Sequence, residues 1–507
     1  MKNKSTKVAR SLVLALAAAA LSLSLVVPAQ LAAQETVKAT QPAVVLSPKE
    51  KELVAAFEGR VKAYADMREA VEDKMTPLPK DATPEQIDRH KAAFMAAVRD
   101  ARASAKFGDI FTPESAAFIR ATIRDEFRGQ DRREYVKAVM EAETKGVPMR
   151  VNYPYPDDKE QLEVPPTLLL RLPQLPKQVK YRFVGRNLLL VDRENTLIVD
   201  LMTDALPDAG VAPTQVASEA AETTETAEGT PVAARTFAPY VSLTLPSKKD
   251  SLRFAVIGDT GTGTEKQHEL ADVMHNYHAA FPFEFVLLLG DNMYGGEKAE
   301  DFKVKFENVY KPLLNDKVKF YAALGNHDES NQRFYELFNM NGEEYYRFEK
   351  GGVAFYALNS NYMDKRQLKW LEDQLAKDTS RWKIAFFHHP PYSSGGKHGS
   401  STGLREVVEP VFVKYGVNVV LAGHEHFYER VKPQKGVYYF ISGAGGKLRK
   451  GDVKDDSGLT EKAYDEDMSF MLFEAAGDEL HFQVVSRTGQ TVDSGLIPNA
   501  KAKPASK

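Results

Sequence analysis

The residues most able to do chemistry follow five apolar runs in the second half of the chain. Each run has the composition of a β-strand, and each leads directly into residue types that bind metal ions. The runs span residues 254–257, 285–289, 320–324, 384–387 and 419–422, and they lead into the sequences GDTG, GDNMY, GNHD, HHPPY and GHEH, respectively. Because ligand sites in open α/β sheets lie at the carboxyl ends of the strands, we expect these five segments to meet in one crevice.

Histidine is concentrated in the same segments. Six of the eleven histidines fall in or near them, namely His327, His388, His389, His398, His424 and His426. One Asp-Gly or Asn-His pair after a strand is ordinarily a turn. Five such segments that together hold more than half of the histidines instead indicate a shared metal site.

These segments resemble the sequence blocks of the calcineurin-like metallophosphoesterases and, among these, of the purple acid phosphatases. The resemblance covers roughly residues 250–495. Many metallophosphoesterases have a histidine two residues after the first aspartate, whereas Gly261 stands there in this chain and Tyr294 supplies the replacement. The resemblance implies an α/β fold, a four-layer α-β-β-α sandwich, for a catalytic domain over residues 241–497.

By this resemblance the chain holds two metal ions with seven ligands. Asp259, Tyr294 and His426 hold the first ion, Asn326, His388 and His424 hold the second, and Asp291 bridges both. Phenolate and carboxylate oxygens suit ferric iron, while an Asn-His-His set suits a divalent ion, so Fe(III) with Zn, Fe or Mn is implied. Two ions about 3.5–4 Å apart can hold substrate oxygens and a nucleophilic hydroxide, which makes a protein nucleophile unnecessary.

Three further residues resemble the family's catalytic groups. His327 and His398 match the histidines that contact phosphate and donate a proton, and Asp328 is expected to orient His327. The polar loop of residues 393–398 also allows His398 to be only a surface residue. His389 is read as structural, although a register shift of one residue would exchange its role with that of His388.

The predicted function is hydrolysis of phosphomonoesters by a metal-bound hydroxide, with a small phosphate ester as substrate. A phosphodiesterase or nucleotidase on the same metal core is the alternative among enzymes. The alternative of another class is a cell-envelope binding protein that uses its N-terminal module, for which the sequence indicates no partner. A net charge of −3 and a pI near 6.5 give no broad basic surface, so nucleic-acid binding is not expected.

The elements that must position these residues divide the chain into several parts, since 507 residues exceed one hydrophobic core. Residues 43–147 are predicted to form a helical module, because three Ser-Pro or Thr-Pro pairs mark helix starts. Residues 148–206 alternate as short strands and predict a small β unit. Residues 207–240 are rich in Ala, Thr, Glu and Pro and predict a flexible linker.

The first 29 residues have the pattern of a signal peptide. Four basic residues precede an apolar run over residues 11–27, and small residues follow. Cleavage is predicted after Ala29, with Ala33 as second choice, and an uncleaved anchor is the alternative. A periplasmic or secreted protein without stable membrane insertion after cleavage is therefore expected. The absence of cysteine excludes disulfides and cysteine-phosphatase chemistry.

Overall fold

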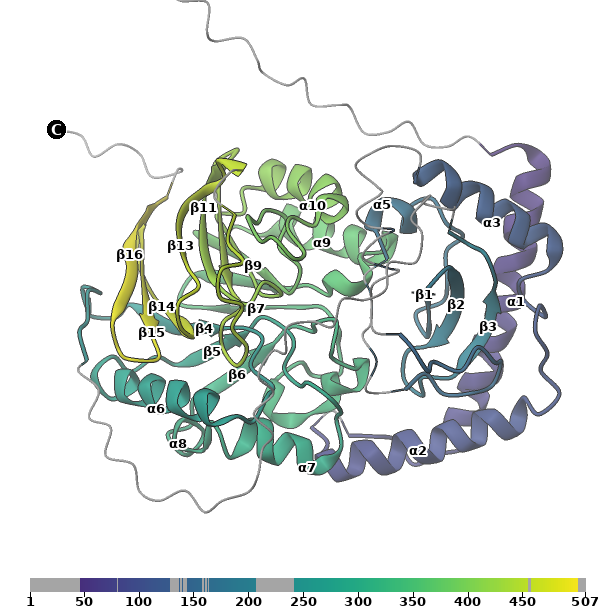
Figure 1. The fold of residues 1–507 in the computed structure, drawn as a ribbon, viewed down its shortest axis with the longest axis horizontal. Helices are drawn as coiled ribbons and strands as arrows, with labels where there is room; N and C mark the ends of the chain where they lie inside the picture. Colours follow the sequence, from purple (N-terminus) through teal and green to yellow (C-terminus); the bar gives the residue numbers. More distant parts are fainter. Residues whose placement is uncertain are drawn as a thin grey trace, which may run out of the picture. The chain divides into compact units, whose positions relative to one another are not determined.

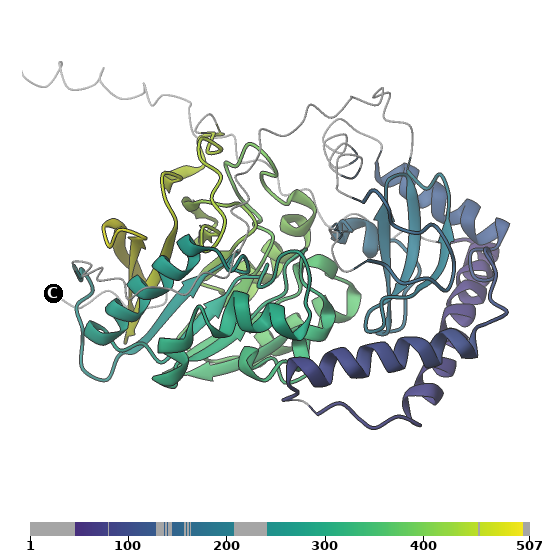
Figure 2. The same cartoon turned by 60° about the horizontal axis from the view of Figure 1, so that its bottom comes forward.

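The computed structural model describes residues 46–206 and 241–499, except residues 80, 128–135, 137–138, 140–143, 157–158, 160–161, 163 and 455–456. The predicted signal segment (1–29) and the predicted linker (207–240) lie outside the described residues. None of the described helices is long and apolar enough to cross a membrane. Figures 1 and 2 show the chain from two directions.

Three helices near the N-terminus begin where the sequence predicts helix starts. They are α1 (Pro48–Glu72), α2 (Pro84–Ala101) and α3 (Pro113–Glu126), and a single turn, α5 (Pro166–Leu169), follows them (Figure 1). Each of the first three has a Ser or Thr N-cap that accepts a backbone N–H, and a proline in its first turn, where no N–H is needed. Ser47 and Thr83 complete capping boxes with Glu50 and Gln86. The helical N-terminal region is confirmed.

A three-stranded antiparallel sheet packs against these helices. Its strands are β1 (Val179–Val184), β2 (Asn187–Asp192) and β3 (Ile198–Met202), in that spatial order. Phe57 of α1, Phe94 of α2 and Ile119 of α3 share one hydrophobic core with Phe183 and Leu190 of the sheet. The helices and the small sheet are therefore one packed unit, called the N-terminal module below (the described part of residues 46–206).

Two larger sheets form the rest of the described fold. Their orders are β16-β15-β14-β4-β5-β6 and β13-β11-β12-β10-β9-β8-β7. The first contains β4 (Leu252–Ile257), β5 (Phe285–Leu288), β6 (Lys319–Ala322), β14 (Ser469–Ala476), β15 (Glu479–Ser486) and β16 (Thr491–Pro498). The second contains β7 (Tyr346–Lys350), β8 (Val353–Ala357), β9 (Trp382–Phe387), β10 (Val419–Ala422), β11 (Tyr428–Gln434), β12 (Val437–Ser442) and β13 (Thr460–Tyr464). β4, β5 and β6 run parallel, as do β8, β9, β10 and β12.

Aromatic side chains join the two sheets face to face. Phe254 of β4 meets Phe355 of β8 edge to face, with 5.2 Å between the ring centroids. Phe440 of β12 and Phe473 of β14 repeat this contact between the sheets at 6.0 Å. Such pairs contribute about 0.5–1.5 kcal/mol beyond the area they bury. The sheets are therefore held as two fixed layers, and this fixes the strand ends that carry the site.

Helices cover both outer faces of the paired sheets (Figure 1). The helical segments of this half are α6 (Glu265–Ala280), α7 (Ala299–Phe302), η1 (Lys303–Glu307), α8 (Lys311–Asn315), η2 (Ser330–Phe334), η3 (Glu336–Phe338), η4 (Ser360–Tyr362), α9 (Lys365–Lys377) and α10 (Thr402–Tyr415). Leu270 of α6 packs into the core shared with the six-stranded sheet. Leu371 of α9 and Leu404 of α10 pack into a separate core on the seven-stranded sheet. The predicted α-β-β-α sandwich is confirmed.

Candidate active site

The five predicted segments meet where strands of the two sheets end. The six-stranded sheet supplies Asp259 after β4, Asp291 and Tyr294 after β5, and Asn326 after β6; the seven-stranded sheet supplies His388 after β9, and His424 and His426 after β10. β5 and β6 end one and two residues before the strand ends that the sequence predicts, so loop backbone carries the ligands that follow them. The structure thus brings all seven predicted metal ligands into one place.

The backbone turns sharply at several of these positions. Asp259, Asp291 and His424 have φ angles of 56°, 50° and 72°, a left-handed conformation that costs free energy for residues other than glycine. Gly261 lies against the neighbouring segment so closely that a Cβ there would be 2.2 Å from the Asn292 carbonyl oxygen. A histidine could not occupy position 261 without moving that segment.

Asp259, Tyr294 and His426 form one group of donor atoms. The Tyr294 hydroxyl donates to Asp259 Oδ1 over 3.1 Å, and His426 Nε2 lies 3.4 Å from the Tyr294 hydroxyl oxygen. His426 Nε2 is also 3.5 Å from Asp259 Oδ1. The Asp259 side chain is fully buried. A phenol, a carboxylate and an imidazole therefore face one point.

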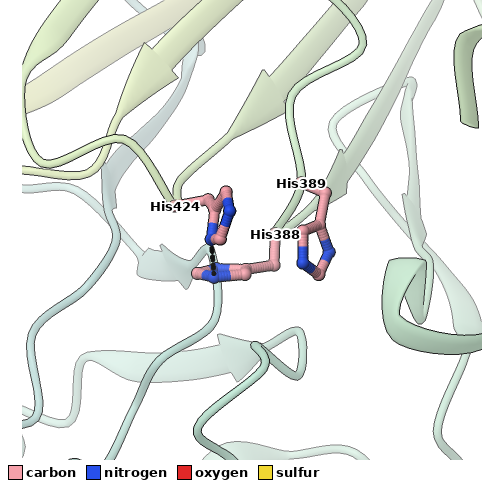
Figure 3. A group of neighbouring side chains, drawn as sticks. All are labelled: His388, His389 and His424. Atoms are coloured by element: carbon pink, nitrogen blue, oxygen red, sulfur yellow. Dashed lines mark hydrogen bonds between the residues drawn. The ribbon is translucent and has the colours of Figure 1, made fainter. Parts of the chain in front are cut away.

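Asn326, His388 and His424 form a second group. His388 Nε2 lies 2.8 Å from Asn326 Oδ1 and 3.1 Å from His424 Nδ1, a contact drawn in Figure 3. His388 Nδ1 donates to the carbonyl of Leu289 over 3.0 Å. In the neutral ring this bond places the proton on Nδ1 and leaves the lone pair of Nε2 available as a metal ligand.

Asp291 lies between the two groups. Its Oδ1 is 3.4 Å from His388 Nε2 and accepts a 3.0 Å hydrogen bond from the backbone N–H of His327. Ligand atoms of Asp259, Asp291 and His388 lie within 4.8 Å of one another. Asp291 is therefore placed to contact ions in both groups.

The electrostatics of this cluster favour a bound cation. Burial and the nearby Asp291 raise the pKa of Asp259 well above its usual value, and burial lowers the pKa values of His424 and His426 well below theirs. Burial and Asp259 likewise raise the pKa of the Tyr294 hydroxyl. Two adjacent carboxylates, neutral imidazoles and a phenol are a donor set that a multivalent cation would stabilise in its deprotonated form. The residues therefore fit a pair of metal ions.

Comparison with known proteins identifies the domain that carries this site. The family model described as calcineurin-like phosphoesterase matches residues 252–428. Residues 252–428 are therefore similar to this family, and the part of the chain that holds them is called the phosphoesterase domain below. The chain is 28% identical to purple acid phosphatase 17 of Arabidopsis thaliana over 295 residues, which are 48% of this chain and 87% of that protein. It is 29% identical to tartrate-resistant acid phosphatase type 5 of Oryctolagus cuniculus over 252 residues, which are 41% and 77% of the two chains.

Among solved structures, a purple acid phosphatase from yellow lupin (Lupinus luteus) seeds aligns with a TM-score of 0.42 and 18% identity, covering 50% of this chain and 55% of that one. The two sequence relatives above show that somewhat less than half of this chain is similar to purple acid and tartrate-resistant acid phosphatases.

Asp328 has a different role in the phosphoesterase domain from the one predicted. Its carboxylate accepts hydrogen bonds from the backbone N–H groups of Gly325, Asn292 and Met293, and from the Gln332 side chain. Neither of its oxygens bonds the ring of His327, so the prediction that Asp328 orients His327 is wrong. Asp328 instead ties the segment after β6 to the segment after β5, and both carry metal ligands.

The structure places the two predicted catalytic histidines on the ligand cluster. The His327 ring packs on the Tyr294 ring, with 4.8 Å between centroids, and its Nε2 is 4.0 Å from Asp291 Oδ2. The His398 ring lies 4.3 Å from that of His424. The His398 ring therefore contacts the ligand cluster, and the residue is also exposed to solvent, as the surface alternative expects.

His389 is oriented by a neighbouring loop. Its Nδ1 is 2.9 Å from Ser360 Oγ, and its backbone N–H donates to the same hydroxyl oxygen over 3.0 Å. Its ring is 4.5 Å from that of His424, and Figure 3 shows it beside His388. Ring nitrogens of His388, His389 and His424 lie within 4.8 Å of one another, so His389 is also placed near the predicted ligands. The contact of His388 with Asn326 favours the register with His388 as the ligand.

Sequence reasoning missed three charged residues of the site. Lys447 Nζ lies 3.9 Å from the centroid of the Tyr294 ring, and Arg449 Nη2 lies 3.2 Å from His426 Nδ1. Burial raises the pKa of Glu425 to about 7; its carboxylate accepts from Gly399 N, one residue after His398, and lies 3.4 Å from Arg449 Nη1. The basic sequence KLRK directly after the GAGG turn was the available signal.

The contact between Arg449 and His426 bears on metal binding. A guanidinium has only donors, so His426 Nδ1 accepts, and the neutral ring carries its proton on Nε2. Nε2 is the atom that faces Tyr294 and Asp259. Holding a metal ion through Nε2 would need the other tautomer of the His426 ring, with the proton on Nδ1.

Proposed function

We propose that this chain is a phosphomonoesterase of the purple acid phosphatase type. One observation carries the proposal: two groups of three donor residues lie on either side of a shared carboxylate, Asp291, at the strand ends. This is the arrangement that two metal ions with one bridging ligand need. The match to a phosphoesterase family model supports the same reaction class.

The donor chemistry supports a choice of metals. Two ions held there would act as Lewis acids toward the phosphate oxygens and toward water as the nucleophile. We infer ferric iron on the Tyr294 side, because phenolate and carboxylate are hard oxygen donors. Zn, Fe or Mn in the divalent state suits the side formed by Asn326, His388 and His424.

Positive and hydrogen-bonding groups around the crevice favour a monoester. A phosphate monoester carries up to two negative charges, whereas a diester carries one. Lys447 and Arg449 supply two cations, and His327 and His398 supply ring N–H groups near the ligands. These four side chains bind a dianion better than a monoanion, because each charge-assisted hydrogen bond strengthens with the charge of the acceptor.

His398 is proposed to supply a proton to the leaving group. Partial burial of its ring, and then the charges of Arg449 and Lys397, lower the pKa of His398 from its usual value, while the residue as a whole remains exposed. A phosphate dianion in the crevice has the opposite effect on this pKa. A protonated His398 ring beside the leaving group would supply the proton that a leaving alkoxide needs.

The test is metal analysis combined with two substrates. Protein incubated with iron and zinc should retain close to two metal ions per chain and hydrolyse nitrophenyl phosphate faster than bis(nitrophenyl) phosphate. Stoichiometric metal with a preference for the diester would favour the phosphodiesterase alternative. A protein that holds no stoichiometric metal would contradict the proposal.

We also propose that the protein is exported, on the basis of the basic and apolar residues at its N-terminus. Expression of the full chain in a bacterium, followed by cell fractionation and determination of the mature N-terminus, tests this. Retention of the complete chain in the cytoplasm would contradict it.

A further inference from the structure

The loop that follows β6 joins the active site to the N-terminal module. This loop, called the Asn326 loop below (residues 325–334), begins with the predicted ligand Asn326 and with His327. Its last residues bind side chains or backbone of the N-terminal module. The loop therefore connects the N-terminal module, for which no catalytic residue is predicted, to two residues that face the proposed metals.

Glu194 of the N-terminal module is the first anchor of this loop. Its carboxylate accepts a hydrogen bond from Arg333 Nη2 over 2.9 Å, and its backbone carbonyl accepts one from Asn331 Nδ2 over 2.7 Å. Arg68 of α1 pairs with the same carboxylate, and the Arg68 side chain is only 3% exposed. A buried arginine thus fixes Glu194, and Glu194 fixes the end of the loop.

Lys91 of α2 is the second anchor. Its Nζ lies 2.7 Å from Glu329 Oε2, and the Glu329 side chain is 4% exposed. The Glu329 backbone N–H donates to Glu297 Oε1 over 2.6 Å. Burial, and then Glu329 and Asp328, raise the pKa of Glu297 well above its usual value. Lys91 therefore places a positive charge next to a cluster of buried carboxylates at the Asn326 loop.

A third connection reaches the start of the loop. Arg193 Nη1 donates to Glu344 Oε2 over 2.6 Å, and Asn359 Nδ2 donates to the same oxygen over 2.8 Å. Asn359 Oδ1 accepts from the backbone N–H of Asn361, whose side-chain amide donates to the Gly325 carbonyl over 2.9 Å. Gly325 immediately precedes Asn326, so this chain of hydrogen bonds ends beside a predicted ligand.

We propose that the N-terminal module positions the Asn326 loop, with Glu194 and Lys91 as positioning residues for Asn326 and His327. This inference rests on the proposed function, and it gives the module a task within the same active site. The physical reason is the loss of a largely buried ion pair at the loop. Removing Lys91 takes an ion-pair partner from Glu329, and removing Glu194 takes one from Arg333. The loop then moves toward water, which solvates these charges. Asn326 then moves away from His388.

The test compares Glu194→Ala and Lys91→Met in the full chain with Asp66→Asn, which removes an exposed ion pair with Lys62 on α1. Zn²⁺ titration of the metal-free proteins should show weaker binding of one of two equivalents by about tenfold or more in the two anchor variants. The turnover number should fall by about 10- to 100-fold. Lys91→Arg should restore both quantities, because it keeps the charge.

Hydrogen–deuterium exchange of the metal-free proteins measures how well the backbone N–H groups of the loop are protected, and it does not depend on activity. Faster exchange at residues 325–334 in the two anchor variants, and not in Asp66→Asn, is expected. Folded variants with wild-type exchange, zinc affinity and turnover would overturn the inference. The inference would also be overturned if the anchor variants lost both zinc equivalents equally and unfolded at the assay temperature. Glu194 and Lys91 would then have a purely structural role. A wild-type chain that binds no zinc but shows the expected exchange pattern would contradict the proposed function alone.

Discussion

The Tyr294 hydroxyl donates a 3.1 Å hydrogen bond to Asp259 Oδ1, so a phenol that follows β5 meets a carboxylate that follows β4. The backbone contact at Gly261 leaves no room for a side chain between these two segments. Tyr294 is therefore the phenol placed to bind the proposed metal ion beside Asp259, and the optical properties of the iron-loaded protein should depend on it.

Tyr294→Phe should remove the visible charge-transfer band of the iron-loaded protein, because that band requires a phenolate bound to ferric iron. The absorption spectrum of oxidised protein measures this. Tyr438→Phe on β12 is a matched control and should leave the band in place. An unchanged band in Tyr294→Phe would show that another group binds the iron.

Asp291→Ala should lose metal and activity together. Asp291 is the carboxylate that contacts both donor groups, and without it the two cations repel each other without a bridging anion. Elemental analysis of the purified variant checks the metal content. A variant that kept both ions would show that Asp291 is not the bridge.

His398→Asn should keep both metal ions and lose about 10²- to 10⁴-fold in turnover, the range expected for a positioned acid–base group. The loss should be smaller for nitrophenyl phosphate than for an alkyl phosphate, because nitrophenolate leaves without protonation. Rate measurements on both substrates separate these cases. Equal losses would assign His398 to phosphate binding only.

Arg449→Met should raise KM for nitrophenyl phosphate by about tenfold or more, since hydrogen bonds to charged groups contribute about 1.5–3 kcal/mol. The change should be smaller for the diester, which carries less charge. Lys450→Met is the neighbouring control, because Lys450 pairs with Glu466 and its side chain is 66% exposed. An unchanged KM in Arg449→Met would remove Arg449 from the substrate site.

Acid should weaken the contact between the N-terminal module and the phosphoesterase domain at Glu344. Burial alone would raise the pKa of Glu344, but Arg193 and Arg333 hold it at about 2, below the ordinary value of 4.5. Charged Glu344 therefore stabilises the folded state above about pH 4.5, by up to about 3 kcal/mol, and this contribution is lost as pH falls toward 2.

Urea unfolding of wild type and Glu344→Gln at several pH values measures this effect. The difference in free energy of unfolding should be largest near neutral pH and should shrink below pH 4.5. Asp373→Asn, which removes an exposed pair with Lys369, should change little at any pH. A difference for Glu344→Gln that stayed constant down to pH 2 would contradict the assignment.

Local sequence patterns determined the helix starts, the strands and the positions of the donor residues. A few neighbouring residues are enough to place the helix starts at the N-caps Ser47, Thr83 and Thr112. Apolar runs likewise place the strands. The donor residues stand directly after those strands, and parallel strands bring their carboxyl ends to one edge. Strand order was not needed to expect Asp259 and Asn326 in one crevice.

Tertiary structure decided what each polar group contacts. Asp328 and His327 are adjacent in sequence, yet the Asp328 carboxylate turns to Asn292 and Met293, because unpaired backbone N–H groups there need an acceptor. The distance along the sequence also does not predict that Arg449 contacts His426 or that Glu194 contacts Arg333. Partners of charged side chains depend on which loops fold together, and spacing along the chain does not contain that information.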